Sequence, residues 1–175
     1  ADKVEYPYLF NYLGVEYLAQ ENLNIAEKLF RRVIKINKED YCASINLSHL
    51  LLKKGNFLEA HALLSELEYI YKSDITFNIN FLICKYKLTD YTDTIQLCKR
   101  VLEIDTKNYY ALVHLSNSYA RLKKIDKSLL VSKNLIELYP SCTSSWLHYS
   151  QNMLIGENYD KSRDLLLEAY NAVAP

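Results

Sequence analysis

The chain has 175 residues, of which 50% are hydrophobic and 24% are charged, and its 21 basic and 21 acidic side chains give a net charge of zero. This balance argues against a dedicated nucleic-acid or anionic-membrane surface, because such surfaces carry an excess of Lys and Arg. With only three Gly and three Pro, the sequence also lacks the turn residues of a many-stranded sandwich or barrel. No apolar run approaches the roughly 18 residues of a membrane span.

The four cysteines, Cys42, Cys84, Cys98 and Cys142, lie far apart and form no CxxC pair. This spacing favours reduced thiols over a disulfide framework or a zinc site. The start of the chain shows no signal peptide, so we predict a cytoplasmic protein, with the nucleus also open. Because the sequence does not begin with Met, we expect it to be a piece of a longer protein.

Helical periodicity runs along nearly the whole chain, and the pattern recurs with a period of about 34 residues. Steps of this length from Ala26 meet only small residues, namely Ala60, Thr94, Ser128 and Ser162. The same steps from Leu23 meet only large ones, namely Phe57, Tyr91, Ile125 and Tyr159. Five repeats therefore follow one another without an insertion, at residues 7–40, 41–74, 75–108, 109–142 and 143–175.

This pattern resembles the tetratricopeptide repeat, whose signature places large residues, Leu-Gly and Tyr on a first helix, and Ala and Phe on a second. Repeat 1 matches it best, with Phe10, Leu13, Gly14, Tyr17, Ala26 and Phe30. The resemblance implies an all-α fold, a right-handed superhelical solenoid of five antiparallel helix pairs. We expect residues 1–175 to form one such domain, because a helix pair buries its apolar faces only by packing on its neighbours.

Two details refine this expectation. Gly55 and Gly156 fall in turns between the two helices of a repeat, where each can supply a left-handed residue that ends a helix. Repeat 3 departs from the pattern, because Asn78, Leu82 and Lys85 replace residues of the large, small and aromatic columns respectively. We expect its first helix to form, with altered packing against its neighbours.

Nothing in the sequence indicates catalysis. It has no Gly-rich phosphate loop, no HExxH, no GxSxG and no Cys/His cluster with metal-ligand spacing. His49, His114 and His148 lie on different repeats, so we expect surface or groove roles for them. The basic column Lys53, Lys87 and Arg121 is a weak phosphate track. We predict no enzyme activity, no cofactor, no nucleic acid and no membrane as a partner.

In tetratricopeptide repeat arrays the first helices line a concave groove, and the resemblance implies a binding surface there. One column of it reads Tyr12, Asn46, Asn80, His114 and His148, all of which can form hydrogen bonds. In some family members an asparagine ladder at this column holds the backbone of an extended peptide, and Asn46 and Asn80 match it. The neighbouring columns add the candidates Tyr8, Asn11, His49, Ile83, Lys87, Tyr110, Asn117, Arg121 and Gln151.

Two questions about this groove stay open. The apolar column Ile45, Ile79, Val113 and Leu147 either anchors a partner or packs the first helices together. If His114 or His148 contacts a ligand, affinity should change between about pH 5.5 and 7.5. The resemblance does not extend to the carboxylate clamp of chaperone-tail binders, because the required cations are absent.

We predict a non-catalytic protein–protein interaction scaffold, a slice of a longer solenoid within a multisubunit assembly. One alternative is an adaptor that binds an extended or helical peptide in the groove, and another is a targeting domain attached to an enzyme. The last expected helix supports the first prediction, because no capping helix follows it. We expect exposed apolar area there, available for self-association or a partner, at Leu165, Leu166, Tyr170 and Val173.

Overall fold

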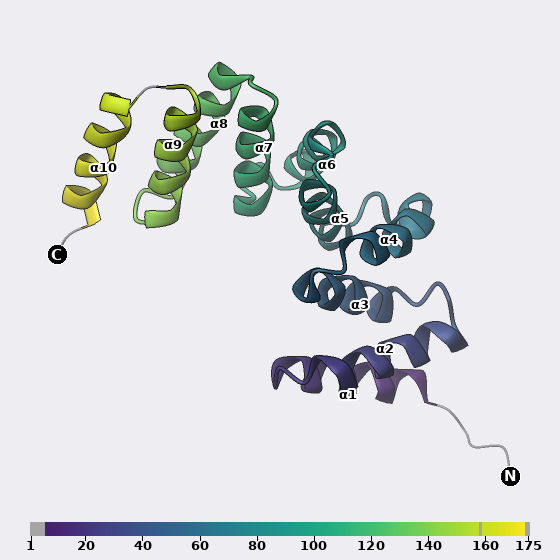
Figure 1. Cartoon of the computed structure of the whole chain (residues 1–175). Coiled ribbons are helices and arrows are strands. Elements are labelled where there is room, and N and C mark those ends of the chain that lie inside the picture. The colour runs from purple at the N-terminus through teal and green to yellow at the C-terminus, as the bar shows by residue number, and fades with distance from the viewer. Residues whose placement is uncertain (1–5, 158, 174–175) are drawn as a thin grey trace, which may run out of the picture. The chain divides into compact units, whose positions relative to one another are not determined.

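The computed structural model describes residues 6–157 and 159–173, without the side chains at positions 165, 169, 170, 172 and 173. Within these ranges the chain forms ten helices and no strand (Figure 1), which confirms the predicted all-α fold of five helix pairs. The pairs are α1 (Pro7–Ala19) with α2 (Leu23–Ile36), α3 (Tyr41–Lys54) with α4 (Phe57–Tyr71), α5 (Ile75–Lys87) with α6 (Tyr91–Ile104), α7 (Tyr109–Arg121) with α8 (Ile125–Leu138), and α9 (Thr143–Ile155) with α10 (Tyr159–Val173).

The helix starts keep the period read from the sequence. First helices begin at 7, 41, 75, 109 and 143, and second helices begin at 23, 57, 91, 125 and 159. The chain divides into two compact bodies, an N-terminal body that ends at Cys84 and a C-terminal body that begins at Lys85. The division falls inside α5, the first helix of repeat 3.

Polar side chains fix the starts of three first helices. The side-chain oxygens of Asp40, Asp74 and Asn108 accept hydrogen bonds of 2.8, 2.7 and 3.1 Å from backbone N–H groups three residues ahead. Such N-caps satisfy donors that have no partner within the helix, and each stabilises a helix by about 1 kcal/mol. Because the three caps occupy the same position in successive repeats, α3, α5 and α7 begin in the same way.

The turn inside each repeat contains one residue with a left-handed backbone, always at the same place. The residues and φ angles are Glu21 (60°), Gly55 (79°), Thr89 (62°), Lys123 (60°) and Glu157 (63°). The prediction for Gly55 is confirmed, and the prediction for Gly156 is wrong. Gly156 has a φ of −85° because its N–H still bonds the carbonyl of Asn152 at 3.2 Å, as in a helix, so the left-handed conformation passes to Glu157.

The column of small residues on the second helices forms the tightest part of the packing. All five members are at most 1% exposed, namely Ala26, Ala60, Thr94, Ser128 and Ser162. A small residue lets two helices approach closely, so this column allows the two helices of each pair to pack tightly. On the first helices Gly14, Ser48, Ser116 and Ser150 are buried in the same way.

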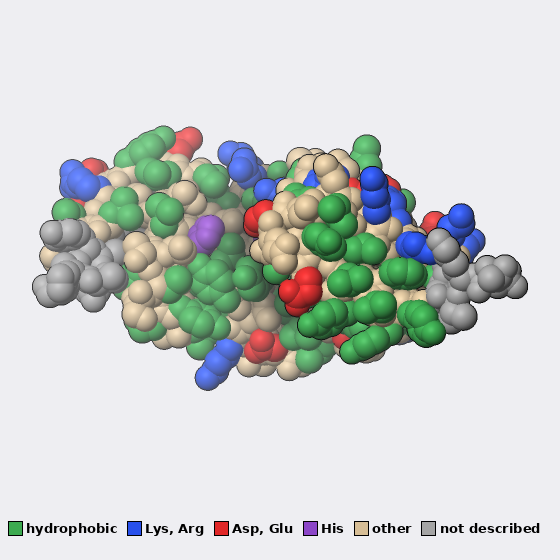
Figure 2. Space-filling view, turned by 90° about the horizontal axis from the view of Figure 1, so that it is seen from below, with side chains coloured by type: hydrophobic (Ala, Val, Ile, Leu, Met, Phe, Trp, Pro, Cys, Tyr) green, Lys and Arg blue, Asp and Glu red, His purple; other side chains and the backbone are tan. Residues whose placement is uncertain are grey.

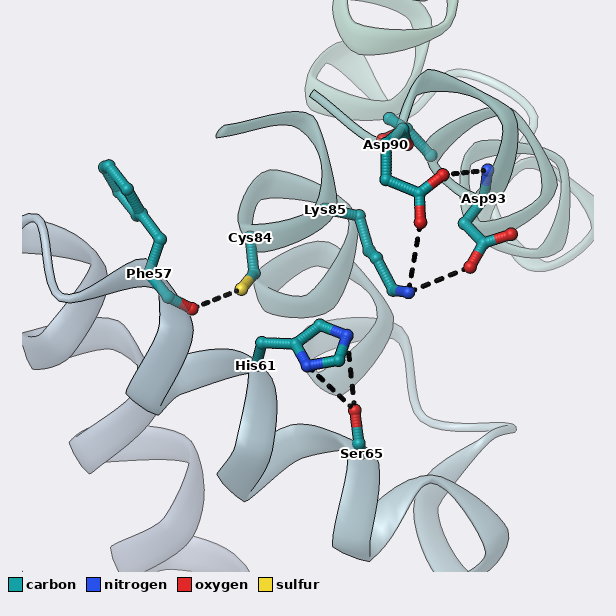
Figure 3. A network of polar contacts seen from close by, with 8 residues as sticks. Phe57, His61, Ser65, Cys84, Lys85, Asp90 and Asp93 are labelled. Carbon is teal, nitrogen blue, oxygen red and sulfur yellow. Dashed lines mark hydrogen bonds and ion pairs between the residues drawn. The ribbon is translucent and has the colours of Figure 1, made fainter. Parts of the chain in front are cut away.

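The two unusual polar residues of repeat 3, Asn78 and Lys85, have hydrogen-bond or ion-pair partners within the fold. Asn78 is fully buried, and its Nδ2 donates hydrogen bonds to the carbonyls of Lys72 (2.8 Å) and Asp74 (2.6 Å). Lys85 Nζ lies 3.2 Å from Asp90 and 2.8 Å from Asp93 (Figure 3). Burial lowers the pKa of Lys85, but its hydrogen bonds to the two carboxylates outweigh burial and raise that pKa above the ordinary value.

Tyrosines tie second helices to the turn before the preceding first helix. The hydroxyl of Tyr71 donates a 2.7 Å hydrogen bond to the carbonyl of Glu39, and the hydroxyl of Tyr139 donates one to the carbonyl of Lys107. Each donor lies 32 residues beyond its acceptor, so the two bonds are the same contact in repeats 2 and 4. Part of the high tyrosine content therefore has a structural role.

Helix α1 exposes residues of two columns that α3 buries. Leu9 is 47% exposed and Leu13 is 37% exposed, whereas Ala43 and Leu47, their equivalents on α3, are 0% and 3% exposed. Figure 2, seen from below Figure 1, shows hydrophobic side chains gathered over this helix. On α10 the side chain of Leu166 is also exposed. The other side chains predicted to be exposed there, Leu165, Tyr170 and Val173, lie outside the described residues.

Candidate binding surfaces

In the N-terminal body, two tyrosines dominate the solvent-facing side of α1. Tyr8 is 84% exposed and Tyr12, one turn later, is 55% exposed. Beside them Asn46 Nδ2 on α3 donates a 3.2 Å hydrogen bond to Asn11 Oδ1, which uses one of its two amide hydrogens. His49 is exposed farther along α3. The structure thus brings five sequence-predicted residues onto neighbouring turns of α1 and α3.

Asn80, the next residue of the predicted ladder, is placed differently. Its side chain is buried, and its Nδ2 donates to the carbonyl of Ile45 (3.3 Å) and to the hydroxyl of Ser48 (2.9 Å). Both amide hydrogens therefore serve the packing of α5 on α3. Ile83, one turn later, is half-buried.

In the C-terminal body the candidate residues lie on α7, α9 and the end of α5. Tyr110 is 58% exposed at the start of α7. Five further candidates lie along the same helices, with Lys87, Arg121 and Gln151 exposed and Asn117 and His148 half-buried. This surface therefore offers aromatic, cationic and amide groups at successive turns.

Two histidines belong to this surface, His114 on α7 and His148 on α9. The His114 ring packs edge-on against Tyr86, with 4.9 Å between the ring centroids. In both histidines Nδ1 is shielded from solvent and has no hydrogen-bond partner among the described residues. A buried N–H without an acceptor is rarer than a buried acceptor without a donor. This favours the tautomer in which Nδ1 is bare and Nε2 carries the proton.

Burial also decides the charge of these histidines. It lowers the pKa of His114 to about 4, and the nearby positive charges of Lys87 and His148 act in the same direction. Burial lowers the pKa of His148 as well. Our expectation of a binding change between about pH 5.5 and 7.5 is therefore wrong for His114, because its ring stays neutral over that range.

The apolar column on the first helices divides by burial. Val113 is buried, Ile45 and Ile79 are half-buried, and Leu147 is 47% exposed. Val113 therefore packs within the fold, while Leu147 presents its side chain to solvent beside His148. Of these four side chains, Leu147 alone is exposed enough to add substantial apolar area to the surface.

A match to a known family covers most of the first two repeats. The family model described as tetratricopeptide repeat matches residues 17–75, which span the end of α1 through the first residue of α5. Over these residues the chain matches the tetratricopeptide repeat family. The resemblance read from its residues is thereby confirmed.

Solved tetratricopeptide repeat structures share this fold. MamA 41-end from Desulfovibrio magneticus RS-1 has a TM-score of 0.87 at 12% identity, covering 98% of this chain and 96% of that one. TTC0263, a thermophilic TPR protein in Thermus thermophilus, has a TM-score of 0.73 at 17% identity, with 95% and 91% covered. YrrB, a TPR protein with an unusual peptide-binding site, has a TM-score of 0.77 at 13% identity, with 93% and 84% covered.

The described residues contain no group of three or more His, Cys, Asp or Glu side chains that could hold a metal ion. None of the helices, as far as they are described, is long and apolar enough to cross a bilayer.

One feature was not predicted from the sequence, a cleft between α2 and α4. Its cationic lip includes Arg31, Lys35 and Lys38 of the first tetratricopeptide repeat. The signal that could have found it is the density of cations on α2, where Lys28, Arg31, Arg32 and Lys35 follow one another over little more than two turns. Net charge over the whole chain conceals this local excess.

Proposed function

We propose that the protein is a non-catalytic interaction scaffold that holds a segment of a partner protein against its first helices. The observation that supports this function is the exposure of three aromatic side chains, Tyr8, Tyr12 and Tyr110. Tyrosine is enriched at protein interfaces because it buries a large apolar ring and still forms a hydrogen bond. The peptide-binding site named for YrrB supports a peptide as the ligand.

The polar residues of this surface have a defined role in the proposal. In the N-terminal body Asn46, and in the C-terminal body the Nε2–H groups of His114 and His148, donate hydrogen bonds to backbone carbonyls of a partner. Neutral donors suit this task, because a peptide carbonyl carries no net charge. Asn80 is left out of the surface, since its donors already bind Ile45 and Ser48.

The experiment is affinity capture followed by measurement of the Kd of the captured partner. One variant carries alanine at Asn46, His114 and His148, and a matched control carries alanine at the exposed second-helix residues Gln96, Lys99 and Asn134. Each lost hydrogen bond costs about 0.5–1.5 kcal/mol, so we expect the first variant to bind more than tenfold more weakly. Equal affinity of both variants would contradict the proposal.

A second candidate function is assembly through the ends of the helix array, within a larger multisubunit structure. It is favoured by the exposed apolar side chains of Leu9 and Leu13 on α1 and of Leu166 on α10. In a repeat protein such columns pack on another helix pair, so the two surfaces are suited to head-to-tail self-association. A reducing compartment such as the cytoplasm fits the four free cysteines.

Light scattering at increasing protein concentration tests this second function. We expect Leu9→Asp to reduce self-association, because it places a charge on the exposed stacking surface of α1. Leu130→Asp on α8 is the matched control, since Leu130 is 71% exposed and lies on another surface. A wild-type chain that stays monomeric at high concentration argues against self-association.

A further inference from the structure

The cleft between α2 and α4 has a volume of about 410 Å³ and lies within the N-terminal body. Its floor is apolar and is formed by three helices, with the side chains of Ile34, Leu47, Leu51, Leu63 and Leu67. One lip carries Arg31, Lys35 and Lys38 of α2 and the turn after it, and the other carries Glu59 and Glu66 of α4. The volume falls in the range of ligand pockets, roughly 300–1,000 Å³.

The charges around this cleft do not cancel. Arg31 Nη2 lies 2.5 Å from Glu59 and 2.7 Å from Glu27, so these acids have a partner within the fold. Lys28, Lys35 and Lys38 are exposed and form no ion pair among the described residues. A second hollow beside the cleft is lined by four cations of the same helix, Lys28, Arg31, Arg32 and Lys35. The α2 lip is therefore the cationic side of the cleft.

The fold itself does not require these cations. Their equivalents in repeat 2 are Ala62, Ser65, Tyr69 and Lys72, and in repeat 3 they are Gln96, Lys99, Glu103 and Thr106. Columns that serve packing recur in every repeat, as the small residues do, whereas this basic set occurs in repeat 1 alone. Packing does not explain why these cations occur in repeat 1, whereas a role in binding does.

We propose that this cleft binds an acidic, amphipathic segment of a partner protein, with an apolar side chain on the floor and carboxylates along the α2 lip. Arg31 and Lys35 lie one helical turn apart on α2 and Lys38 lies in the turn that follows it, so the three cations line one lip at a spacing of four and three residues. Carboxylates repeating every three or four residues on a partner helix match this spacing. The apolar floor favours such a segment over a free anion, which has nothing to bury there.

Synthetic peptides test the proposal by fluorescence anisotropy with the full chain, and about four helical turns, or about 14 residues, give each peptide enough length to span the lip. The acidic probe has Leu at helical spacing with Glu along one flank, the basic probe has Lys in place of each Glu, and a third probe scrambles the acidic sequence. We expect saturable binding of the acidic probe, with the basic and scrambled probes at least about tenfold weaker. Binding of the acidic probe should weaken as salt is raised, because exposed charges are screened.

Variants of the chain test whether the peptide probes bind in this cleft. Lys35→Glu combined with Lys38→Glu should weaken the acidic probe by about tenfold or more and should improve binding of the basic probe. Ala62→Trp should weaken the acidic probe by occupying the cleft, since Ala62 lines it and is exposed. The matched control, Lys99→Glu with Lys133→Glu, makes the same charge change at exposed positions of α6 and α8 and should leave binding within about twofold.

Four results would overturn the proposal. They are no saturable binding of the acidic probe below about 1 mM, equal binding of the scrambled probe, equal binding by the Lys35/Lys38 variant, and equal loss in the control. Binding of anionic phosphatidylserine vesicles that the Lys35/Lys38 variant loses, without a preference among peptides, would assign the surface to lipid instead. None of these variants touches the first-helix surface, so failure here leaves the proposed function standing.

Discussion

The ring of Phe30 packs against the backbone of Gly14 so closely that a Cβ atom at Gly14 would lie 2.5 Å from Cε1 of Phe30. Phe30 is fully buried, so its ring has little room to move away. We expect Gly14→Ala to destabilise the protein by about 1–3 kcal/mol through overpacking. Urea unfolding followed by circular dichroism measures this change.

A neighbouring substitution provides the control for Gly14. Val15 is 41% exposed on the same helix, so Val15→Ala should change the free energy of unfolding by less than about 0.5 kcal/mol. If Gly14→Ala changes the free energy of unfolding as little as Val15→Ala does, the close approach of α1 and α2 is contradicted.

The second prediction concerns the left-handed turn residues. A left-handed backbone costs a residue with a side chain about 1–2 kcal/mol, and the cost is greatest for β-branched residues such as Thr89. Thr89→Gly should therefore stabilise the protein by about 0.5–1 kcal/mol, after the entropy that glycine loses on folding is included. Gly55→Ala should destabilise it by a similar amount. Thermal unfolding measures both changes, and we expect the two substitutions to shift the unfolding temperature in opposite directions.

The third prediction follows from His114. Its pKa is about 4 in the folded protein and about 6.5 in the unfolded chain, so the unfolded chain binds more protons between these values. Stability should therefore fall as pH drops from about 6.5 towards 4, by no more than about 3 kcal/mol. His114→Gln removes this proton uptake, so the variant should lose less stability between pH 7 and 4.5 than the wild type does. Equal losses in both would show that His114 does not titrate in this way.

The fourth prediction tests our proposal that the two bodies form one domain. Trp146, the single tryptophan, is buried in the C-terminal body and donates a 2.8 Å hydrogen bond to the carbonyl of Pro140. Ala60→Leu overpacks the N-terminal body and should cost about 1–3 kcal/mol. In one cooperative domain it should lower the urea midpoint of Trp146 fluorescence as much as that of circular dichroism. An unchanged fluorescence midpoint would mean that the bodies unfold separately.

The regular repeat period explains why most of the fold was predictable. Helix starts and the small-residue column depend on contacts that every repeat makes, so the sequence displays them five times. Asn80 was not predictable, because its side chain bonds two partners in another repeat, the carbonyl of Ile45 and the hydroxyl of Ser48. The cleft between α2 and α4 was missed for a similar reason, since three helices from two repeats form it and no column of the pattern marks it.

The equivalence of Asp40 and Asp74 has a consequence for protein engineering. Both cap a first helix with the same geometry, at 2.8 and 2.7 Å, and both precede it directly. Excision of residues 41–74 would therefore join Asp40 to Ile75 at a junction whose local geometry is already native to the chain. Whole repeats could therefore be deleted, duplicated or exchanged at such junctions without new linkers.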